Sequence, residues 1–174
     1  MSSVPPPVRA PLFLLIAAVL GAEVRLDPPL VRQDKNGCGA ASVAMVMRYW
    51  ATQMDGVETP APSAIEAAVR ADADGGLPLA EMKRYLGEHG FRAFTVRGGM
   101  DDVVQHLERR RPLIAVLQPG KHKGLHYVVL SGFDDRRVWL HDPARGRPKR
   151  MNRQKFEQQW AAADRWMLLA APDR

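Results

Sequence analysis

Residues 33–50 read QDKNGCGAASVAMVMRYW, and they contain Cys38, the only cysteine of the sequence. Small residues lead from Cys38 into a dense apolar run without proline, which predicts a largely buried helix from Cys38 to Trp50. A thiol in the first turn of a helix feels the positive end of the helix dipole, which favours the nucleophilic thiolate. Because one thiol cannot form a disulfide within the chain, this stretch indicates a candidate nucleophile at the start of a central helix.

The segments around this helix predict further helices, followed by mostly antiparallel strands. Ser63 and Glu66 form a capping box for a short helix, and Pro78 opens another helix that ends at Gly90. The other predicted elements are an extended segment at residues 23–32, strands at 91–96, 113–117, 126–132, 138–141 and 166–169, and helices at 101–110 and 152–160. Helices first and strands afterwards predict an α+β fold in one domain.

Composition and charge restrict the class of protein. The chain has 174 residues, of which 46% are hydrophobic and 25% charged, as is typical of one globular domain with a real core. The net charge of +6 fits nucleic acid, an anionic membrane surface or an acidic substrate. Its densest basic groups, at residues 109–111 and 145–153, lack the interleaved aromatic residues of a single-strand binder. We therefore predict a solvated basic face and no nucleic acid partner.

The first residues have the order of a secretory signal peptide. Arg9 precedes the apolar run 12–20, and the small residues Gly21 and Ala22 follow it, so we predict a signal peptide at residues 1–22. The run is short for a transmembrane helix, and a retained N-terminal anchor formed by residues 12–20 is the alternative. The sequence thus predicts a domain at residues 23–174 that is periplasmic or secreted.

A cysteine nucleophile needs a base and a group that orients the base. Of the five histidines, His126 begins an apolar strand directly after a glycine-containing loop, where its side chain can face a cleft. A hairpin that turns near residues 134–135 places the start of the first strand beside the end of the second, so Asp142 falls close to His126. The amide of Gln33 and the backbone N–H of Cys38 are candidate oxyanion donors.

Each of these residues also has a structural interpretation. A cysteine at a helix start is often a small buried filler, a strand histidine is often a satisfied core residue, and Asp-Pro commonly opens a turn. A metal site built from His122, His126, His141 and Asp142 is a weak alternative, because the chain has one cysteine and no HExxH spacing. We predict no metal and no other cofactor.

Three blocks carry a resemblance to a known family, and the pair Phe156 and Trp160 adds to it. The blocks are Gln33 with Cys38-Gly39-Ala40-Ala41, His126 to Gly132, and Val138 to Gly146. The sequence resembles the papain-like bacteriocin-processing cysteine peptidases, which cut leader peptides after a double glycine. The resemblance implies a papain-like α+β fold, with N-terminal helices packed on a mostly antiparallel sheet.

By the same resemblance, Cys38 is the nucleophile, His126 the general base and acid, Asp142 the orienting carboxylate and Gln33 the oxyanion donor. The family commonly has an acidic residue before its catalytic cysteine, where this sequence has Gly37. No ATP-binding cassette follows the matched blocks, so the sequence resembles a stand-alone, exported relative.

The preferred interpretation is an exported cysteine endopeptidase that acts as a monomer. Its expected partner is a peptide or protein substrate, such as a Gly-Gly precursor or a secreted subunit, with an envelope secretion system as a further partner. One alternative is a non-catalytic peptide-binding or accessory domain of the same fold. Another is a cell-envelope amidase or acyltransferase, because the same three groups also serve acyl transfer to water or an amine.

Overall fold

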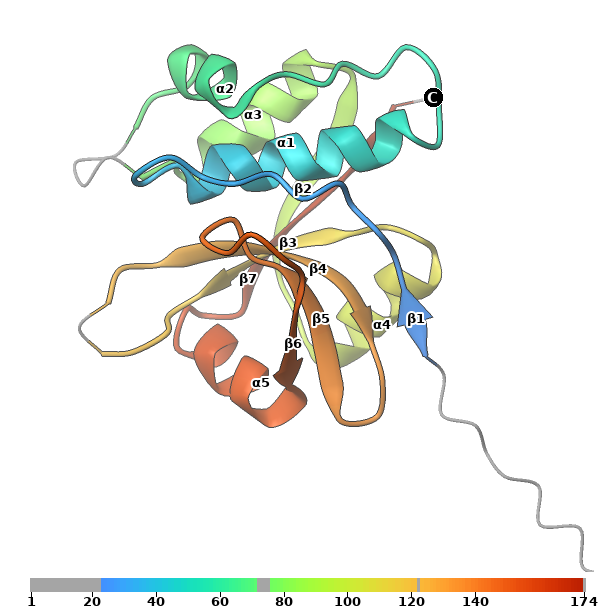
Figure 1. The fold of residues 1–174 in the computed structure, drawn as a ribbon, viewed down its shortest axis with the longest axis vertical. Coiled ribbons are helices and arrows are strands. Elements are labelled where there is room, and N and C mark those ends of the chain that lie inside the picture. Colours follow the sequence, from blue (N-terminus) through green and yellow to red (C-terminus); the bar gives the residue numbers. More distant parts are fainter. Residues whose placement is uncertain (1–22, 72–75, 122, 174) are drawn as a thin grey trace, which may run out of the picture.

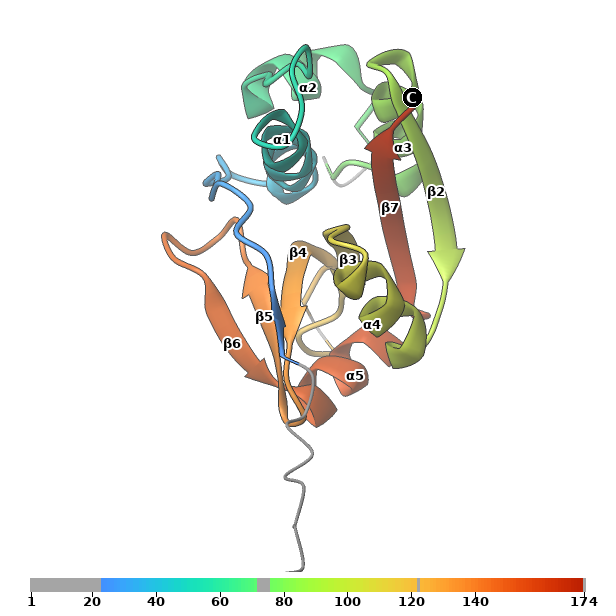
Figure 2. The same ribbon diagram turned by 90° about the vertical axis from the view of Figure 1, so that its right-hand side faces the viewer.

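The computed structural model describes residues 23–71, 76–121 and 123–173, which form one antiparallel sheet flanked by helices (Figures 1 and 2). The strands are β1 (Val24–Arg25), β2 (Phe91–Arg97), β3 (Leu113–Leu117), β4 (His126–Phe133), β5 (Arg137–His141), β6 (Lys149–Asn152) and β7 (Trp166–Pro172). The helices are α1 (Cys38–Ala51), α2 (Pro62–Ala68), α3 (Leu79–Glu88), α4 (Met100–Glu108) and α5 (Arg153–Ala161). The strand order is β2-β7-β3-β4-β5-β6, with β1 paired to β4.

Both faces of the sheet are buried. The helices α1, α2 and α3 lie on one side, while α4 and α5 lie on the other (Figures 1 and 2). Successive residues of β3 face opposite ways, so Ile114 and Val116 join the core under α1, and Leu113, Ala115 and Leu117 join the core over α4 and α5. The predicted α+β fold with N-terminal helices on an antiparallel sheet is confirmed.

The helix α1 runs through the upper core, as its uninterrupted apolar sequence predicts. Its residues from Gly39 to Met47 are all buried, and the indole N–H of Trp50 donates a hydrogen bond to the carbonyl of Ala170 in β7 at 3.0 Å. Burial over this length fixes the axis of α1 against the sheet. The N-terminal end of α1, with Cys38, therefore has a defined position beside the start of β4.

The predicted capping box at Ser63 is wrong. Helix α2 begins at Pro62 after Ala61 and has no side-chain cap, because proline at the first position already supplies a helical φ angle. The carboxylate of Glu66 instead lies against Gly37. The strand β6 was not predicted from the sequence, since its four residues are mostly polar, and α5 begins just after it with Asn152 as its N-cap.

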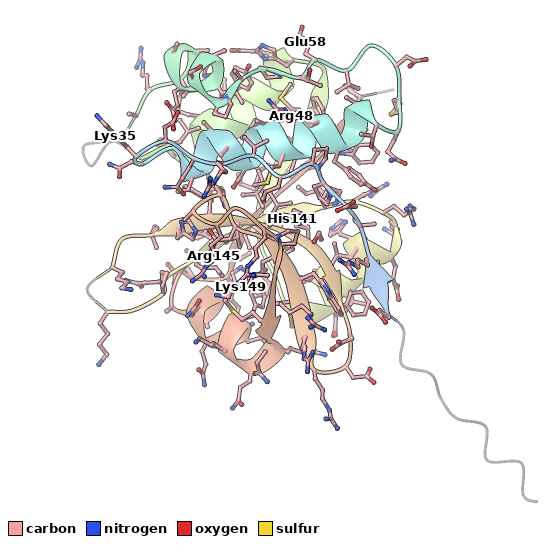
Figure 3. The ribbon with its side chains drawn as sticks, viewed as in Figure 1. Lys35, Arg48, Glu58, His141, Arg145 and Lys149 are labelled. Atoms are coloured by element: carbon pink, nitrogen blue, oxygen red, sulfur yellow. The ribbon has the colours of Figure 1, made fainter. Side chains whose placement is uncertain are left out.

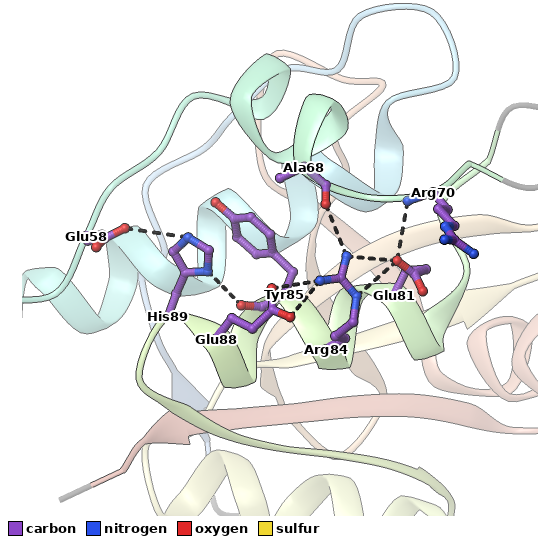
Figure 4. A network of polar contacts seen from close by, with 8 residues as sticks. All are labelled: Glu58, Ala68, Arg70, Glu81, Arg84, Tyr85, Glu88 and His89. Carbon is purple, nitrogen blue, oxygen red and sulfur yellow. Dashed lines mark hydrogen bonds and ion pairs between the residues drawn. The ribbon is translucent and has the colours of Figure 1, made fainter.

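A network around Arg84 attaches the end of α2 to α3 (Figure 4). The Arg84 guanidinium donates to the carbonyl of Ala68 at 3.1 Å and pairs with Glu81 and Glu88 at 2.9 and 2.7 Å. Glu81 also accepts the backbone N–H of Arg70 at 3.3 Å. These bonds are exposed and individually weak, but together they tie the end of α2 to α3.

The hairpin of β4 and β5 contains a β-bulge at Ser131. Phe133 pairs with Val138 and Gly132 with Trp139, whereas beyond the bulge Leu130 pairs with Leu140 and Val129 with His141. One extra residue in β4 changes which residues of β5 share its face. Asp142 follows β5 directly, and its carboxylate reaches His126 at the start of β4.

A membrane-spanning helix needs a minimum length and hydropathy. No helix within the described residues is long and apolar enough to cross a bilayer. The predicted signal peptide or anchor at residues 1–22 lies outside the described residues.

Gly132 is the position of the hairpin that is most sensitive to substitution, because β1 crosses directly over it. A Cβ atom there would collide with the carbonyl of Val24 and the Cα of Arg25, both backbone atoms that cannot move independently. We expect Gly132→Ala to lower the free energy of unfolding by about 1–3 kcal/mol, measured by urea denaturation. The control is Gly87→Ala, which has open space in the exposed part of α3 and should leave stability unchanged or slightly raised. Equal stability of the two variants would contradict the close packing of β1 on β4.

Candidate active site

Cys38 and His126 face each other across a cleft between α1 and the sheet. Cys38 is the first residue of α1, and His126 is the first residue of β4. The cleft has a volume of about 320 Å³ and is lined by Gln33, Asn36, Cys38, Gly76, Leu77, Gly124, Leu125, His126 and Tyr127. Helix and strand thus bring together two side chains that are 88 positions apart in the sequence.

Asp142 orients the imidazole of His126. Its Oδ1 atom lies 2.7 Å from Nε2 of His126, and the two side chains are 12% and 21% exposed. The backbone N–H of Ala144 donates to the same oxygen at 3.0 Å, while the Arg145 guanidinium lies 3.5 Å from Oδ2. Burial raises the pKa of Asp142, but the hydrogen bond and charge of His126 outweigh it, and the pKa is lowered overall. Asp142 is therefore a carboxylate that fixes the tautomer of His126.

The environment of Cys38 favours a thiolate–imidazolium pair. Nε2 of His126 is hydrogen-bonded to Asp142. The hydrogen bond between His126 and the thiol is therefore assigned to the other ring nitrogen, Nδ1. Burial raises the pKa of Cys38, but this bond, the backbone N–H of Tyr127 and the charge of His126 lower it overall. Burial also lowers the pKa of His126, yet the bonds to Asp142 and Cys38 raise it to about 9. The hydrogen bond and charge of His126 thus outweigh burial and lower the pKa of the Cys38 thiol.

Gln33 lies beside the thiol, and the turn after β5 holds it there. Its backbone N–H donates to the carbonyl of Pro143 at 3.0 Å, next to Asp142. Its side-chain Nε2 donates one hydrogen to the carbonyl of Lys35 at 2.6 Å and has a second hydrogen to donate, while its Oε1 is buried without a hydrogen-bond partner. The backbone N–H of Cys38 is one of the first N–H groups of α1, which have no acceptor within the helix. Two donors therefore border the same cleft.

Two other histidines of the described residues, His141 and His89, do not line this cleft. His141 is buried, and its Nδ1 lies 3.0 Å from the Ser131 hydroxyl at the bulge. His89 stacks on Tyr85 at a centroid distance of 4.0 Å in the upper layer (Figure 4). His122, which belonged to the weak metal alternative, lies outside the described residues. The residues that the structure describes contain no group of three or more ligands suited to a metal ion.

Glu66 borders the active site, a position that the sequence did not predict. Its carboxylate packs where Gly37 has no side chain, one residue before Cys38. Both residues line a second cavity of about 400 Å³, which shares Asn36, Gly76 and Leu77 with the Cys38 cleft. An acidic group thus stands near the cysteine, but α2 supplies it in place of the residue preceding Cys38. The missing side chain at Gly37 was the one sequence signal for this contact.

The family to which the sequence matches agrees with the geometry of the cleft. Residues 25–166 match the Peptidase_C39 like family. The chain belongs to this family. The resemblance to bacteriocin-processing cysteine peptidases, drawn from the three sequence blocks, is thereby confirmed.

Two curated relatives match three quarters of the chain. The probable functional amyloid protease FapD of Pseudomonas fluorescens is 30% identical over 139 residues, which are 75% of this chain and 56% of FapD. The lactococcin-G-processing and transport ATP-binding protein LagD of Lactococcus lactis subsp. lactis is 26% identical over 132 residues, 75% of this chain and 17% of LagD. The chain therefore spans just over half of one relative and a sixth of the other.

Solved structures show the same fold. A C39-like peptidase from Bacillus anthracis superimposes with a TM-score of 0.69 at 18% identity, covering 86% of this chain and 98% of that one. At this identity the comparison concerns the fold alone, and it supports the papain-like arrangement of helices on an antiparallel sheet.

The acidified thiol can be measured directly, because every alkylation event reports on the single cysteine. We expect the rate of iodoacetamide labelling to rise with a pH midpoint below the ordinary thiol value of about 8.5. In His126→Ala the midpoint should move upward, since burial of Cys38 remains while its hydrogen-bond partner is lost. His89→Ala, outside the cleft, is the control and should leave the midpoint unchanged. Identical midpoints in wild type and His126→Ala would contradict the proposed ion pair.

The contact between Gly37 and Glu66 predicts an energetic coupling. A methyl group at position 37 would meet the Glu66 carboxylate and the carbonyl of Asp34, so we expect Gly37→Ala to cost about 1–3 kcal/mol of stability. In a Glu66→Ala background part of this cost should vanish, with a coupling of about 0.5 kcal/mol or more in a double-mutant cycle. Urea denaturation of the four variants measures it, and purely additive effects would show that Glu66 does not occupy this position.

Proposed function

We propose that the protein is a cysteine endopeptidase in which Cys38, His126 and Asp142 form the catalytic triad. The observation that carries the proposal is the position of His126, which bonds Asp142 through one ring nitrogen and faces Cys38 with the other. Membership of a peptidase family supports this chemistry. A neutral filler cysteine would need neither an oriented imidazole nor a carboxylate behind it.

In the proposed reaction, the Cys38 thiolate attacks the carbonyl carbon of the scissile bond. The backbone N–H of Cys38 and Nε2 of Gln33 donate to the oxyanion that develops on the carbonyl oxygen. The C–N bond then breaks as the His126 imidazolium gives its proton to the leaving amine, which leaves a thioester on Cys38. Water, deprotonated by His126, attacks the thioester and releases the new carboxylate. Asp142 stabilises the imidazolium in both halves of the cycle.

We further propose that the substrate is an exported polypeptide and that the enzyme works outside the cytoplasm. The order of residues 9–22 supports export. The names of two relatives, a lactococcin-processing protein and a functional amyloid protease, support a precursor peptide or secreted subunit as the substrate. The cavity beside Cys38 gives such a chain room on the α2 side of the cleft.

The proposal is tested by hydrolysis of an unstructured peptide mixture. Cys38→Ala should abolish cleavage, and Asp142→Asn should lower kcat/KM by about 10²–10⁴-fold, because the imidazole loses its orientation and charge partner. Asp101→Asn, exposed on α4, is the matched control and should retain full activity. Equal peptide binding by wild type and Cys38→Ala without turnover by either would show a binding domain. Products from purified murein, with none from peptides, would show an amidase.

The pH profile gives a second, independent test. Activity should fall at low pH as Cys38 becomes protonated, and at high pH as His126 loses the proton that the leaving amine needs. Since the pKa of His126 is raised to about 9, the alkaline limb should lie near pH 9, with both limbs belonging to the coupled pair. Asp142→Asn removes one cause of this increase and should move the alkaline limb to lower pH. If the alkaline limb lies at the same pH in Asp142→Asn as in wild type, Asp142 does not raise the pKa of His126.

A further inference from the structure

The whole positive excess of the chain lies in one stretch, residues 136–155, here called the basic segment. It contains eight basic residues and one acidic residue, Asp142, for a net charge of +7, while the whole chain carries +6. The eight basic residues are Arg136, Arg137, Arg145, Arg147, Lys149, Arg150, Arg153 and Lys155. The other 154 residues together carry a net charge of −1. The structure folds this segment into β5, β6 and the start of α5.

The basic side chains of the segment are mostly unpaired, although Asp134, Asp135 and Glu157 flank it in the sequence. Arg137 stands opposite Asn152 and Arg150 opposite Trp139, and Arg153 donates its backbone N–H to the carbonyl of Arg136. Among the described residues, Arg145 and Arg153 have a carboxylate within ion-pair distance and the other six basic side chains do not. Figure 3 shows Arg145 and Lys149 near each other on the face below α1. Six unneutralised cations on adjacent elements form a strong positive field.

Protection of a sheet edge accounts for only part of this charge. Basic residues on an unpaired edge strand discourage pairing with another chain, which explains Lys149 and Arg150 on β6. Arg136 precedes β5 in the hairpin turn, and Arg145 and Arg147 lie in the connection between β5 and β6, where no edge is exposed. Arg136 and Arg147 are exposed and have no carboxylate within ion-pair distance, which points to an anionic surface outside the protein.

The start of the described chain lies within the same basic region. Glu23 and Arg25 line a hollow of about 370 Å³ together with Trp139, Lys149 and Arg150. The apolar run 12–20 precedes Glu23 by only two residues. The lower ends of β1, β5 and β6 also lie at the end of the molecule that carries α5 (Figures 1 and 2). The basic region therefore lies close to the point where an apolar segment joins the domain.

We propose that the basic segment is a docking surface for anionic lipid headgroups, which holds the domain against a membrane. Charge complementarity supplies the attraction, because each Lys or Arg near an anionic bilayer strengthens binding about fivefold. Where residues 12–20 are retained as an N-terminal anchor, this apolar run favours a lipid surface over an acidic polypeptide. Docking requires neither Cys38 nor His126, so it stands or falls separately from the peptidase proposal.

The test is sedimentation of the full chain with vesicles of phosphatidylcholine alone or mixed with phosphatidylglycerol in a ratio of about 2:1. We expect tighter binding to the anionic vesicles, and loss of this difference at high salt. Arg136→Glu/Arg137→Glu/Arg150→Glu should weaken anionic binding by about a hundredfold or more. The matched control, Lys83→Glu/Arg109→Glu/Arg111→Glu, changes the net charge equally outside the basic segment and should cost less than about threefold.

Three results would overturn the proposal. The first is equal binding to neutral and anionic vesicles, and the second is an equal loss in the two triple variants. The third is unchanged vesicle binding by the first variant together with slower cleavage of acidic peptides, which would assign the segment to substrate. Near-UV circular dichroism of each variant verifies the fold. Peptide hydrolysis without vesicles should match wild type in both triple variants.

Discussion

The active site depends on the register of β4 against β5. The bulge at Ser131 shifts this pairing by one residue before it reaches His141, and Asp142, directly after His141, bonds His126 at the start of β4. Several contacts hold this bulge: the Leu26 N–H donates to the Ser131 carbonyl at 2.6 Å, and His141 bonds the Ser131 hydroxyl. His141 therefore has a structural place in the site although it lies outside the cleft. A one-residue change in register would separate the acid from the base.

The second requirement is that α1 and the sheet remain fixed relative to each other. Cys38 and His126 belong to different layers, so their hydrogen bond depends on the packing of the core between the layers. The buried length of α1 and the bond from Trp50 to β7 provide this rigidity far from the thiol. The backbone bond from Gln33 to Pro143 joins the same two layers at the cleft itself. Geometry at the site is thus maintained from both ends of α1.

Most helices and strands, and part of the candidate site, could be predicted from the sequence. Hydrophobic periodicity indicates helices and strands, and a short hairpin determines which residues of its two strands lie side by side. The helix beginning at Cys38 and the proximity of His126 and Asp142 followed from local patterns of this kind. The bulge was not predicted, although Gly132 within the strand is a sequence signal for a bulge or for the close approach of another backbone. The location of Glu66 also required the tertiary structure, because its spacing from Ser63 satisfied a capping box that the helix does not use. Long-range packing decided both cases.

The central position of β7 has a consequence for when the site exists. Residues 166–172 insert between β2 and β3, and β3 in turn supports the strand that begins with His126. Pairings between such distant segments form late, after long loops have closed. A nascent chain that still lacks these residues has no complete sheet. Synthesis of the chain through β7 therefore precedes completion of the sheet that carries His126.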